Sequence, residues 1–366
     1  MNIREQRFSH DTVINLYAPD EYAWSEIVDQ LKADVYYLPS YVRLAAMQEH
    51  GKPILFVCRS RGNIWLLPLI VRAIPERITE GLILYDAISP YGYSGPLAFV
   101  EDGDDWIDWN EWATKLFIQT LIHNDIITAF VRLHPLYQTQ IDVLRRHGDL
   151  HGPTSTVVID LDYDDERIWN NTRSSHRTDI RNLEKKGFVT RQDVDLGRLD
   201  VFKDIYKETM HRIGASENYV FNELYYEHIR KDMADVFRLF FVEYDSQFVC
   251  GGLFAETNGI VHYHLSGTRT AYLRAAPTKL MLDHVRRWSK MRGNTKFHLG
   301  GGRGGENDTL LRFKQGFSRT YMDFYTWRVI ADVGAYKNLN ENSARTNRQI
   351  AFDIPKNYFP AYRALS

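Results

Sequence analysis

Apolar residues recur in the same order in both halves of the chain. In the second half, 237–245 (FRLFFVEYD), 248–257 (FVCGGLFAET) and 260–266 (IVHYHLS) are apolar over strand lengths. Asn258-Gly259 separates the last two segments, and a type I′ hairpin turn favours this dipeptide because both positions need positive φ. The three segments therefore predict an antiparallel meander.

A helix and a further strand follow this meander. The loop 267–276 leads to Pro277, a residue that suits the first position of a helix. Apolar residues then recur at helical spacing as far as Met291, and Gly293 stands where a C-terminal cap glycine belongs. Residues 295–299 (TKFHL) predict a strand that returns parallel to its neighbour through a right-handed crossover.

The first half gives a similar order of elements from an unrelated sequence. In chain order the pattern predicts a helix at 40–50, strands at 53–59, 63–71 and 82–87, a loop at 88–97, a helix around 109–121, a strand at 128–134, a helix at 140–148 and a strand at 155–162. This order matches the acetyltransferase (GNAT) fold. We therefore expect a mixed α/β protein of two tandem GNAT-like units, residues 1–160 and 161–366, whose mixed central sheets pack around a shared cleft. The pattern leaves open whether the tail 332–366 packs back on the first unit.

Composition narrows the class of protein. The net charge of −2 excludes a basic nucleic-acid coat, so any polyanion must be bound by a local patch. The only two cysteines, Cys58 and Cys250, lie inside strand-like runs and predict neither a disulfide framework nor a cysteine metal site. No window approaches about 18 uninterrupted apolar residues, and the N-terminus shows no signal peptide. We expect a cytoplasmic protein without a transmembrane segment.

Four segments carry a family likeness that spreads over roughly residues 35–335. They are SPYGYSGP (89–96), IYKETMHRIGASENYVF (205–221), HYHLSGT (262–268) and FHLGGGRGGENDTLLRFKQGFS (297–318). Together they resemble the Fem aminoacyltransferases and their GNAT relatives. The resemblance implies transfer of an amino acid from aminoacyl-tRNA, or of an acyl group from a coenzyme A thioester, onto an amine. It implies no tightly bound cofactor, and it allows tRNA, a cell-wall or glycan precursor and the inner membrane surface as partners.

The chain departs from the family in one loop that bears on the donor. A GNAT domain usually has closely spaced glycines before its long helix, where they bind the pyrophosphate of coenzyme A. Here TRTAYLRAAP (268–277) stands in that place. The departure counts against coenzyme A as the donor, and the preference for aminoacyl-tRNA rests on the family resemblance alone.

The closing block predicts the catalytic group. Lys314 sits in a short helix, and its ammonium placed near a reacting carbonyl would stabilise the oxyanion of a tetrahedral intermediate. The family likeness places a lysine at this motif, whereas a single lysine is by default solvated. Asp308 is expected to cap the helix or to accept a proton.

The glycines of this block predict close approach to a substrate, because a bare backbone leaves room for one. The alternative is a purely structural connection between strand and helix. The substrate-binding candidates here are Gly301, Gly302, Arg303 and Phe313.

A stripe of basic residues at intervals of four predicts a binding face. Its members are Arg173, Arg177, Arg181 and Lys185, and Arg177 and Arg181 are the binding candidates. On a helix they share one face and repel each other, and a phosphate or tRNA backbone would relieve that repulsion. The alternative is a solvated face that Asp179 and Glu184 partly balance.

Five further residues are candidates for substrate binding. Tyr91 and Tyr93 lie in a loop suited to stacking on a sugar or base, or to packing between the two units. Arg212 and Tyr219 belong to a family-like segment, where Arg212 would bind a carboxylate or phosphate or pair with a nearby glutamate. His264 lines the cleft or is a satisfied core residue. The histidine two positions before it faces the same way, and without a third ligand the pair is weak evidence for zinc.

Three functions remain open. The first is an acyltransferase that moves an aminoacyl or acyl group, from aminoacyl-tRNA by preference, onto an amine of a cell-wall precursor or a related glycan or nucleotide acceptor. The second is an acyl-CoA-dependent N-acyltransferase on an amino sugar or small amine. The third is a non-catalytic nucleic-acid-binding protein.

Overall fold

The computed structural model describes residues 11–137, 139–215, 221–302, 308–346 and 358–364. The chain forms two compact units. The first unit consists of Met1–Lys32, Tyr36–Pro153 and Phe324–Ser366, and the second of Ala33–Val35 and Thr154–Asp323. The boundary between the units after Pro153 lies near the boundary predicted at residue 160. The C-terminal segment from Phe324 belongs to the first unit.

The first unit contains a mixed sheet with the strand order β1-β2-β3-β4-β6-β13, and β5 pairs with β3. Only β4 and β6 pair in parallel; the other pairs for which a register is defined are antiparallel. The strands are β1 (Thr12–Tyr17), β2 (Lys52–Ser60), β3 (Asn63–Ala73), β4 (Tyr85–Ile88), β5 (Leu97–Phe99) and β6 (Ile126–Arg132). The helices are α2 (Tyr22–Gln30), α3 (Pro39–Glu49), α4 (Glu76–Thr79), α5 (Trp106–His123), α6 (Ile141–Arg146) and α13 (Val333–Thr346). Two strands, β7 (Asp149–Asp160) and β13 (Thr320–Ile330), have residues in both units.

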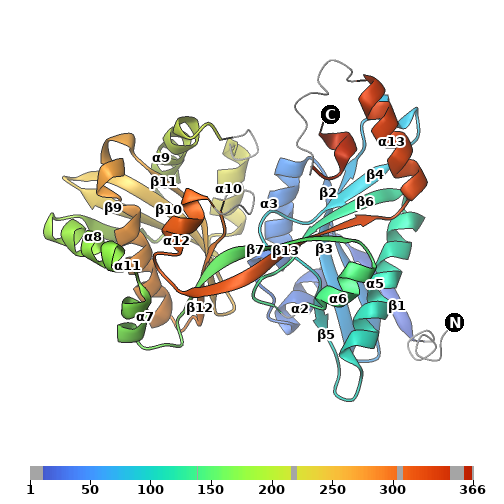
Figure 1. The fold of residues 1–366 in the computed structure, drawn as a ribbon, viewed down its shortest axis with the longest axis horizontal. Helices are drawn as coiled ribbons and strands as arrows, with labels where there is room; N and C mark the ends of the chain where they lie inside the picture. The colour runs from blue at the N-terminus through green and yellow to red at the C-terminus, as the bar shows by residue number, and fades with distance from the viewer. Residues whose placement is uncertain (1–10, 138, 216–220, 303–307, 347–357, 365–366) are drawn as a thin grey trace. The chain divides into compact units, whose positions relative to one another are not determined.

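The helix α5 covers one face of this sheet (Figure 1). It begins at a capping residue, Asp105, whose carboxylate accepts hydrogen bonds from two backbone N–H groups of the first turn. Its apolar stripe, which includes Trp109 and Phe117, packs on Phe56 and Trp65 of the hairpin β2–β3. The parallel return of β6 beside β4 through α5 is the crossover that the sequence predicts.

The second unit repeats this arrangement with the strand order β7-β12-β11-β10-β9-β8. Its strands are β8 (Val189–Asp193), β9 (Phe237–Tyr244), β10 (Gln247–Thr257), β11 (Ile260–Thr268) and β12 (Lys296–Gly300). Its helices are α7 (Asp165–Asn171), α8 (Ser174–Lys185), α9 (Leu199–Arg212), α10 (Glu223–Asp232), α11 (Thr278–Met291) and α12 (Thr309–Lys314). The meander β9–β10–β11 is antiparallel and β12 pairs with β11 in parallel, which confirms the predicted mixed α/β architecture.

Two-residue turns join the strands of this meander. Asn258 and Gly259 have φ of 43° and 84°, as the predicted type I′ turn requires. Asp245 and Ser246 also have positive φ, so the first turn is equally tight. Gln247, which lies between the two strand segments that the sequence predicts, begins β10.

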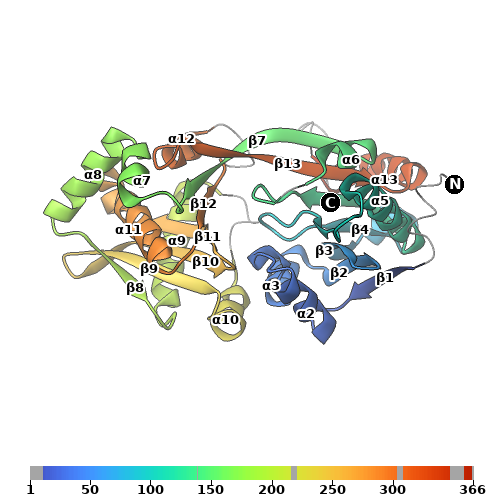
Figure 2. The ribbon, with the colours of Figure 1, turned by 90° about the horizontal axis from the view of Figure 1, so that it is seen from below.

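Helices cover both faces of the second sheet. A Cβ on Gly251 would come 3.1 Å from Phe202 of α9, whereas one on Gly252 would come 2.7 Å from Met281 of α11. Because neighbouring residues of a strand point to opposite faces, α9 and α11 lie on opposite sides of the sheet. The helices α8 and α11 lie side by side in both views (Figures 1 and 2). Among the described residues, no helix combines the length and apolar character that crossing a membrane requires.

Candidate functional site

The parallel strands β11 and β12 separate at one end of the second unit's sheet. Their register joins Ile260–His262 with Lys296–His298, whereas β11 continues to Thr268. β12 ends at Gly300, where a φ of 76° turns the chain away. Ligands of open α/β sheets bind at the carboxyl ends of parallel strands. We therefore place the candidate site at this opening.

Lys314 brings a buried ammonium to the opening. It ends α12, and its side chain is 8% exposed. Its Nζ donates a 2.7 Å hydrogen bond to the carbonyl oxygen of Gly301, the residue that follows β12. The same Nζ lies 5.8 Å from the ring centre of Tyr263 in β11, within the range of a cation–π contact. The lysine therefore touches both sides of the opening and is not the solvated residue of the alternative interpretation.

Burial sets the charge of this lysine. Desolvation lowers the pKa of Lys314 to about 8, and the nearby charge of Asp308 opposes that shift. The ammonium is therefore largely protonated at pH 7, and half of it is deprotonated at about pH 8. Strongly perturbed lysines are typical of functional sites, because burying a cation costs stability.

Asp308 is the N-cap of α12. Its carboxylate accepts a 2.8 Å hydrogen bond from the backbone N–H of Leu311, as the sequence predicts. The residue therefore serves two purposes: it begins the helix that carries Lys314, and its charge helps to keep the lysine protonated.

Of the glycines before α12, Gly301 lies close to other backbone. A Cβ on Gly301 would lie 3.0 Å from the carbonyl oxygen of Ser155. Gly301 and Gly302 are half-buried, and Gly301 is the direct partner of Lys314. Arg303, the next candidate, lies outside the described residues. Phe313 packs edge-to-face on Phe317, with ring centres 5.5 Å apart, so its observed contacts are those of the core.

His264 is a half-buried histidine with a hydrogen-bond partner. Its Nε2 lies 2.6 Å from the hydroxyl oxygen of Tyr225 in α10. Burial, and secondarily the charge of His262, lowers the pKa of His264 to about 3. The ring is therefore neutral at physiological pH, which fits the satisfied-core interpretation of the sequence better than binding of an anion.

Arg212 holds the end of β11. Its guanidinium donates hydrogen bonds to the carbonyl oxygen of Thr268 at 3.1 Å and to the hydroxyl of Thr270 at 3.0 Å. Glu208, an expected partner, instead pairs with Arg269 at 3.0 Å. Within the described ranges no carboxylate pairs with Arg212. Tyr219, predicted in the same segment, lies outside the described residues.

The four predicted cations do form one basic face of α8. Arg173 is its N-cap, and the other three, Arg177, Arg181 and Lys185, follow along the helix. The acids of α8 do not balance them: Asp179 pairs with Lys279 and Glu184 with Arg287, both on α11. Among the described residues, none of the four cations forms an ion pair.

Two members of the basic face are held in place by α7. Arg177 donates hydrogen bonds of 3.2 Å to the carbonyl oxygen of Trp169 and to the side-chain oxygen of Asn170. The guanidinium of Arg181 lies 5.4 Å from the ring centre of Trp169. These contacts orient both arginines without neutralising them.

Tyr91 and Tyr93 belong to the first unit. Tyr91 is 42% exposed, and its carbonyl oxygen accepts a 2.9 Å hydrogen bond from the hydroxyl of Tyr41. Tyr93 packs edge-to-face on Tyr36 and on Phe324, with ring centres 5.7 and 5.2 Å apart. Of the two, Tyr91 retains an exposed ring for a ligand, whereas Tyr93 supports the loop.

Three buried polar residues near the opening escaped the sequence analysis as a group. The imidazole of His262 lies between the carboxylate of Asp34 and the imidazole of His298. The sequence offers one signal for Asp34, a lone acid between Ala33 and Val35. Its proximity to a strand more than 200 residues away has no local signature.

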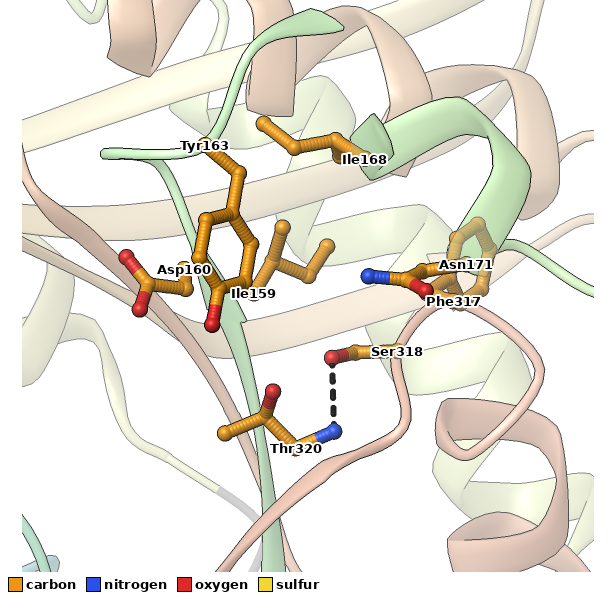
Figure 3. Close-up of a pocket in the computed structure, with 8 residues that line it drawn as sticks. All are labelled: Ile159, Asp160, Tyr163, Ile168, Asn171, Phe317, Ser318 and Thr320. Carbon is orange, nitrogen blue, oxygen red and sulfur yellow. Dashed lines mark hydrogen bonds between the residues drawn. The ribbon is translucent and has the colours of Figure 1, made fainter. Parts of the chain in front are cut away.

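The second unit also contains a small depression (Figure 3). Its empty volume is about 190 Å³. Its one charged residue, Asp160, is paired with Lys296 at 2.8 Å, and Ser318 accepts a hydrogen bond from the backbone N–H of Thr320. The lining residues are Ile159, Asp160, Tyr163, Ile168, Asn171, Phe317, Ser318 and Thr320. None of the predicted site residues is among them, so we do not assign a ligand to it.

Comparison of the chain with known proteins identifies the class of its fold. Residues 170–315, which include Lys314, match the family model of the acetyltransferase (GNAT) domain. The structure of FemX superposes with a TM-score of 0.64 at 12% identity, covering 86% of this chain and 97% of that one. L-PGS from Bacillus licheniformis gives a TM-score of 0.54 at 12% identity, with 88% and 96% covered.

A third structure agrees with these two. A C-terminal domain assigned to a lysylphosphatidylglycerol synthetase of Agrobacterium fabrum gives a TM-score of 0.55 at 11% identity, with 88% of this chain and 95% of that one covered. No curated protein matches the chain.

These comparisons confirm the class inferred from the sequence. The chain has the fold of FemX and related GNAT-like proteins, as the resemblance implied. Residues 170–315 of its second unit match an acetyltransferase domain, and the protein is an enzyme of the acyltransferase class. A binding protein without catalysis, the third function considered, does not fit this result.

Proposed function

We propose that the protein transfers an aminoacyl or acyl group from an activated donor to an amine, with Lys314 stabilising the reacting carbonyl. The observation that carries the proposal is the buried ammonium at the opening between β11 and β12. An ammonium has three N–H donors. Among the described residues Lys314 uses one of them, on Gly301, which leaves two for an oxyanion.

The reaction needs no covalent enzyme intermediate. The amine nitrogen attacks the carbonyl carbon of the donor, a C–N bond forms and the carbonyl oxygen becomes an oxyanion next to Lys314. Collapse of this intermediate breaks the bond to the donor oxygen or sulfur. Charge that develops in a buried, preorganised site is stabilised strongly, and removal of one donor typically costs about 100- to 1000-fold in rate.

The basic face of α8 supports aminoacyl-tRNA as the preferred donor. Four cations that form no ion pair within the described part of the chain repel one another, and a nucleic-acid backbone would relieve that repulsion by binding them. Arg177 and Arg181 are already oriented by α7. Arg212 is a candidate for a phosphate or carboxylate closer to β11.

An acyl-CoA-dependent N-acyltransferase is the second candidate, because the matched family model is that of an acetyltransferase domain. In the loop before α11, Thr270–Ala275 form a 3₁₀-helix and Arg274 is exposed. This loop lacks closely spaced glycines for a pyrophosphate, which keeps coenzyme A second to tRNA.

For the acceptor, we propose an amine of a cell-wall precursor or a related glycan or nucleotide. The support is the structural likeness to FemX and the predicted family resemblance. We further propose that the enzyme works in the cytoplasm and contacts the inner membrane surface peripherally.

A transfer assay separates the donors. Charged tRNA and acyl-CoA are offered singly with the same set of amines, and the amide product is detected by mass spectrometry. Product from charged tRNA alone supports the preferred donor, and product from acyl-CoA alone establishes the second candidate. No product with either donor under any condition overturns the proposal.

A further inference from the structure

Two hydroxyl groups of β11 lie next to each other near the ammonium of Lys314. The phenol oxygen of Tyr263 and the side-chain oxygen of Ser266 share a hydrogen bond in which either atom can be the donor. Among the described residues, neither side chain has another hydrogen-bond partner. Both residues are half-buried, so part of each remains exposed. We call these two groups the hydroxyl pair.

An irregularity in β11 brings the hydroxyl pair to one face of the sheet. Residues three apart on a regular strand point to opposite faces. In β11, His264 is an extra residue relative to β10, between Tyr263 and Leu265. Because of this extra residue, Ser266 pairs with Gly252, a position of β10 that faces α11. Tyr263 and Ser266 therefore share the face that α11 covers.

The ammonium of Lys314 lies on this same face. Its Nζ is 5.8 Å from the ring centre of Tyr263, and its helix packs through Leu311 on the core that includes Met281 of α11. Tyr263 and Ser266 belong to the part of β11 that extends beyond its pairing with β12. A carbonyl that accepts a hydrogen bond from Lys314 would therefore lie close to the hydroxyl pair.

The surroundings keep the hydroxyl pair neutral. Burial raises the pKa of Tyr263, the hydrogen bond from Ser266 opposes that shift, and the nearby Cys250 adds to it. The thiol of Cys250 is itself neutral, because burial raises its pKa as well. Lys314, whose pKa is about 8, is a second titratable neighbour. The hydroxyl pair thus keeps its two hydrogens over the pH range in which Lys314 titrates.

Attack of an amine on an oxygen ester moves one proton from the nitrogen to the leaving oxygen. The nitrogen is positively charged once it has bonded and must lose a proton, whereas an alkoxide leaves poorly unless it gains one. Two linked hydroxyls can do both, because each accepts one hydrogen and donates another. Each hydroxyl ends with one hydrogen, as it began, so the transfer needs no further acid or base.

We infer that the hydroxyl pair carries this proton, with Tyr263 and Ser266 as catalytic residues. The inference rests on the proposed function and deepens it, because it assigns an oxygen ester, such as aminoacyl-tRNA, as the donor. A phenol is a stronger acid than an alcohol, so Tyr263 gives its hydrogen to the leaving oxygen while Ser266 takes one from the amine and passes its own to Tyr263. The C–N bond has formed, the C–O bond breaks, and the oxyanion at Lys314 becomes a carbonyl again. A thioester needs no such transfer, because a thiolate leaves as an anion.

Tyr263→Phe and Ser266→Ala test the hydroxyl pair, and Tyr263→Phe keeps the ring beside Lys314. The full chain is assayed with charged tRNA and the set of amines, and kcat and KM are measured from pH 6 to 9. Each variant should lose at least about tenfold in kcat with little change in KM, since positioned proton transfer typically contributes about 100- to 10,000-fold. The alkaline limb near pH 8 should stay in place because Lys314 is intact. The double variant should be no slower than the slower single variant, because either change breaks the same path.

Tyr244→Phe is the matched control. Tyr244 is a half-buried tyrosine that packs on the same core and stacks on Phe188, and its loss of a hydroxyl should leave the rate unchanged. Circular dichroism shows which variants are folded, and if one single variant does not fold, the other decides. A folded single variant at the wild-type kcat, additive losses in the double variant, or an alkaline limb that moves in Tyr263→Phe would each overturn the inference.

The donor separates this inference from the proposed function. Transfer from acyl-CoA alone overturns the role of the hydroxyl pair, while the proposed function survives with its second candidate. A wild type that transfers from neither donor overturns the proposed function, and the inference with it.

Discussion

Lys314 is retained at a cost to the fold. A pKa lowered from 10.5 to about 8 by burial means that the folded protein binds this proton less tightly than the unfolded chain does. The free energy of unfolding therefore rises with pH between about 8 and 10.5. Below this range, burial of the charged lysine lowers the free energy of unfolding by up to about 3 kcal/mol. A residue that opposes folding in this way is expected to serve activity.

The first prediction follows from this balance. Lys314→Met should unfold at a higher denaturant concentration than wild type at pH 7, and it should lack the rise in stability between about pH 8 and 10.5. Transfer should fall at least about 100-fold, because the oxyanion loses its cation. Denaturant titrations of both proteins at several pH values provide the measurement.

Lys296→Met serves as the matched control. Burial alone would lower the pKa of Lys296, but its bonds to Asp160 and Asp162 raise the pKa overall. This lysine supports the fold, so its loss should lower stability while transfer persists. An unstable Lys314→Met, or one that retains full transfer, speaks against the assignment.

The second prediction concerns the charge next to Lys314. The carboxylate of Asp308 raises the pKa of Lys314 against the effect of burial. Asp308→Asn keeps a capping side chain but removes the charge, so the alkaline limb of transfer should move below its wild-type position near pH 8. Asp308→Ala should additionally cost about 1 kcal/mol of stability through the lost cap. A pH–rate profile in which the alkaline limb stays in place in both variants would remove Asp308 from the site.

At the scale of elements, α8 packs one side into the core of the second unit and carries the basic face on another side. Its inner side holds His176, Ile180 and Leu183 in the core, and its acids face α11. We expect the basic face to bind a polyanion, although the net charge of the whole protein is −2. Binding should therefore depend on this face and not on overall charge.

The third prediction tests that dependence. Arg181→Ala and Lys185→Ala should each weaken tRNA binding and reduce the slope of log affinity against log salt by about 1. Lys231→Ala is the control, since Lys231 is an exposed lysine on α10 with an acidic neighbour, Glu227. Filter binding at several salt concentrations measures all four proteins. Equal slopes in every protein would assign tRNA, if it binds, to another surface.

The packing of α8 against the turn after α12 gives a fourth prediction. Gly316 has no room for a side chain, because a Cβ would come 2.0 Å from the His176 ring. Gly316→Ala should cost about 1–3 kcal/mol of stability. Removing the ring in His176→Ala should make the glycine substitution nearly neutral. Unfolding free energies of the two single variants and the double variant measure this coupling, and simple additivity would contradict the contact.

The sequence predicted those strands that pair with a neighbour close by in the chain. The dipeptide Asn258-Gly259 marked its hairpin because only a type I′ turn suits it. The strand β13 had no comparable signal, since its residues 326–330 pair with β6, nearly 200 residues earlier. The same limit hid Asp34, whose partner His262 lies 228 residues away.

Family resemblance and residue chemistry contributed differently to the site. The motif predicted Lys314 as the catalytic group, but its burial and its hydrogen bond to Gly301 are seen only in the structure. For His264 the sequence left open whether it lines the cleft or is a satisfied residue of the core, and only the structure places its Nε2 2.6 Å from the hydroxyl of Tyr225. The sequence shows which ionisable groups are present, whereas their burial and neighbours in the fold determine which of them are charged.

The whole molecule consists of two units built on one plan, each with its own core. The first core centres on α5 and the hairpin β2–β3, and the second on β10, β11 and α11. Among the described residues, the acetyltransferase match, the buried Lys314 and the buried residues Asp34, His262 and His298 all lie in the second unit. We therefore assign the chemistry to the second unit.

One measurement tests this assignment most directly. Wild type and Lys314→Met, both shown to be folded by circular dichroism, are given the donor that supports transfer together with its amine, and single-turnover rates are compared from pH 6 to 9. The account predicts a wild-type rate that falls as the pH rises through about 8, and a variant at least about 100-fold slower throughout. A folded variant that transfers at the wild-type rate would contradict it.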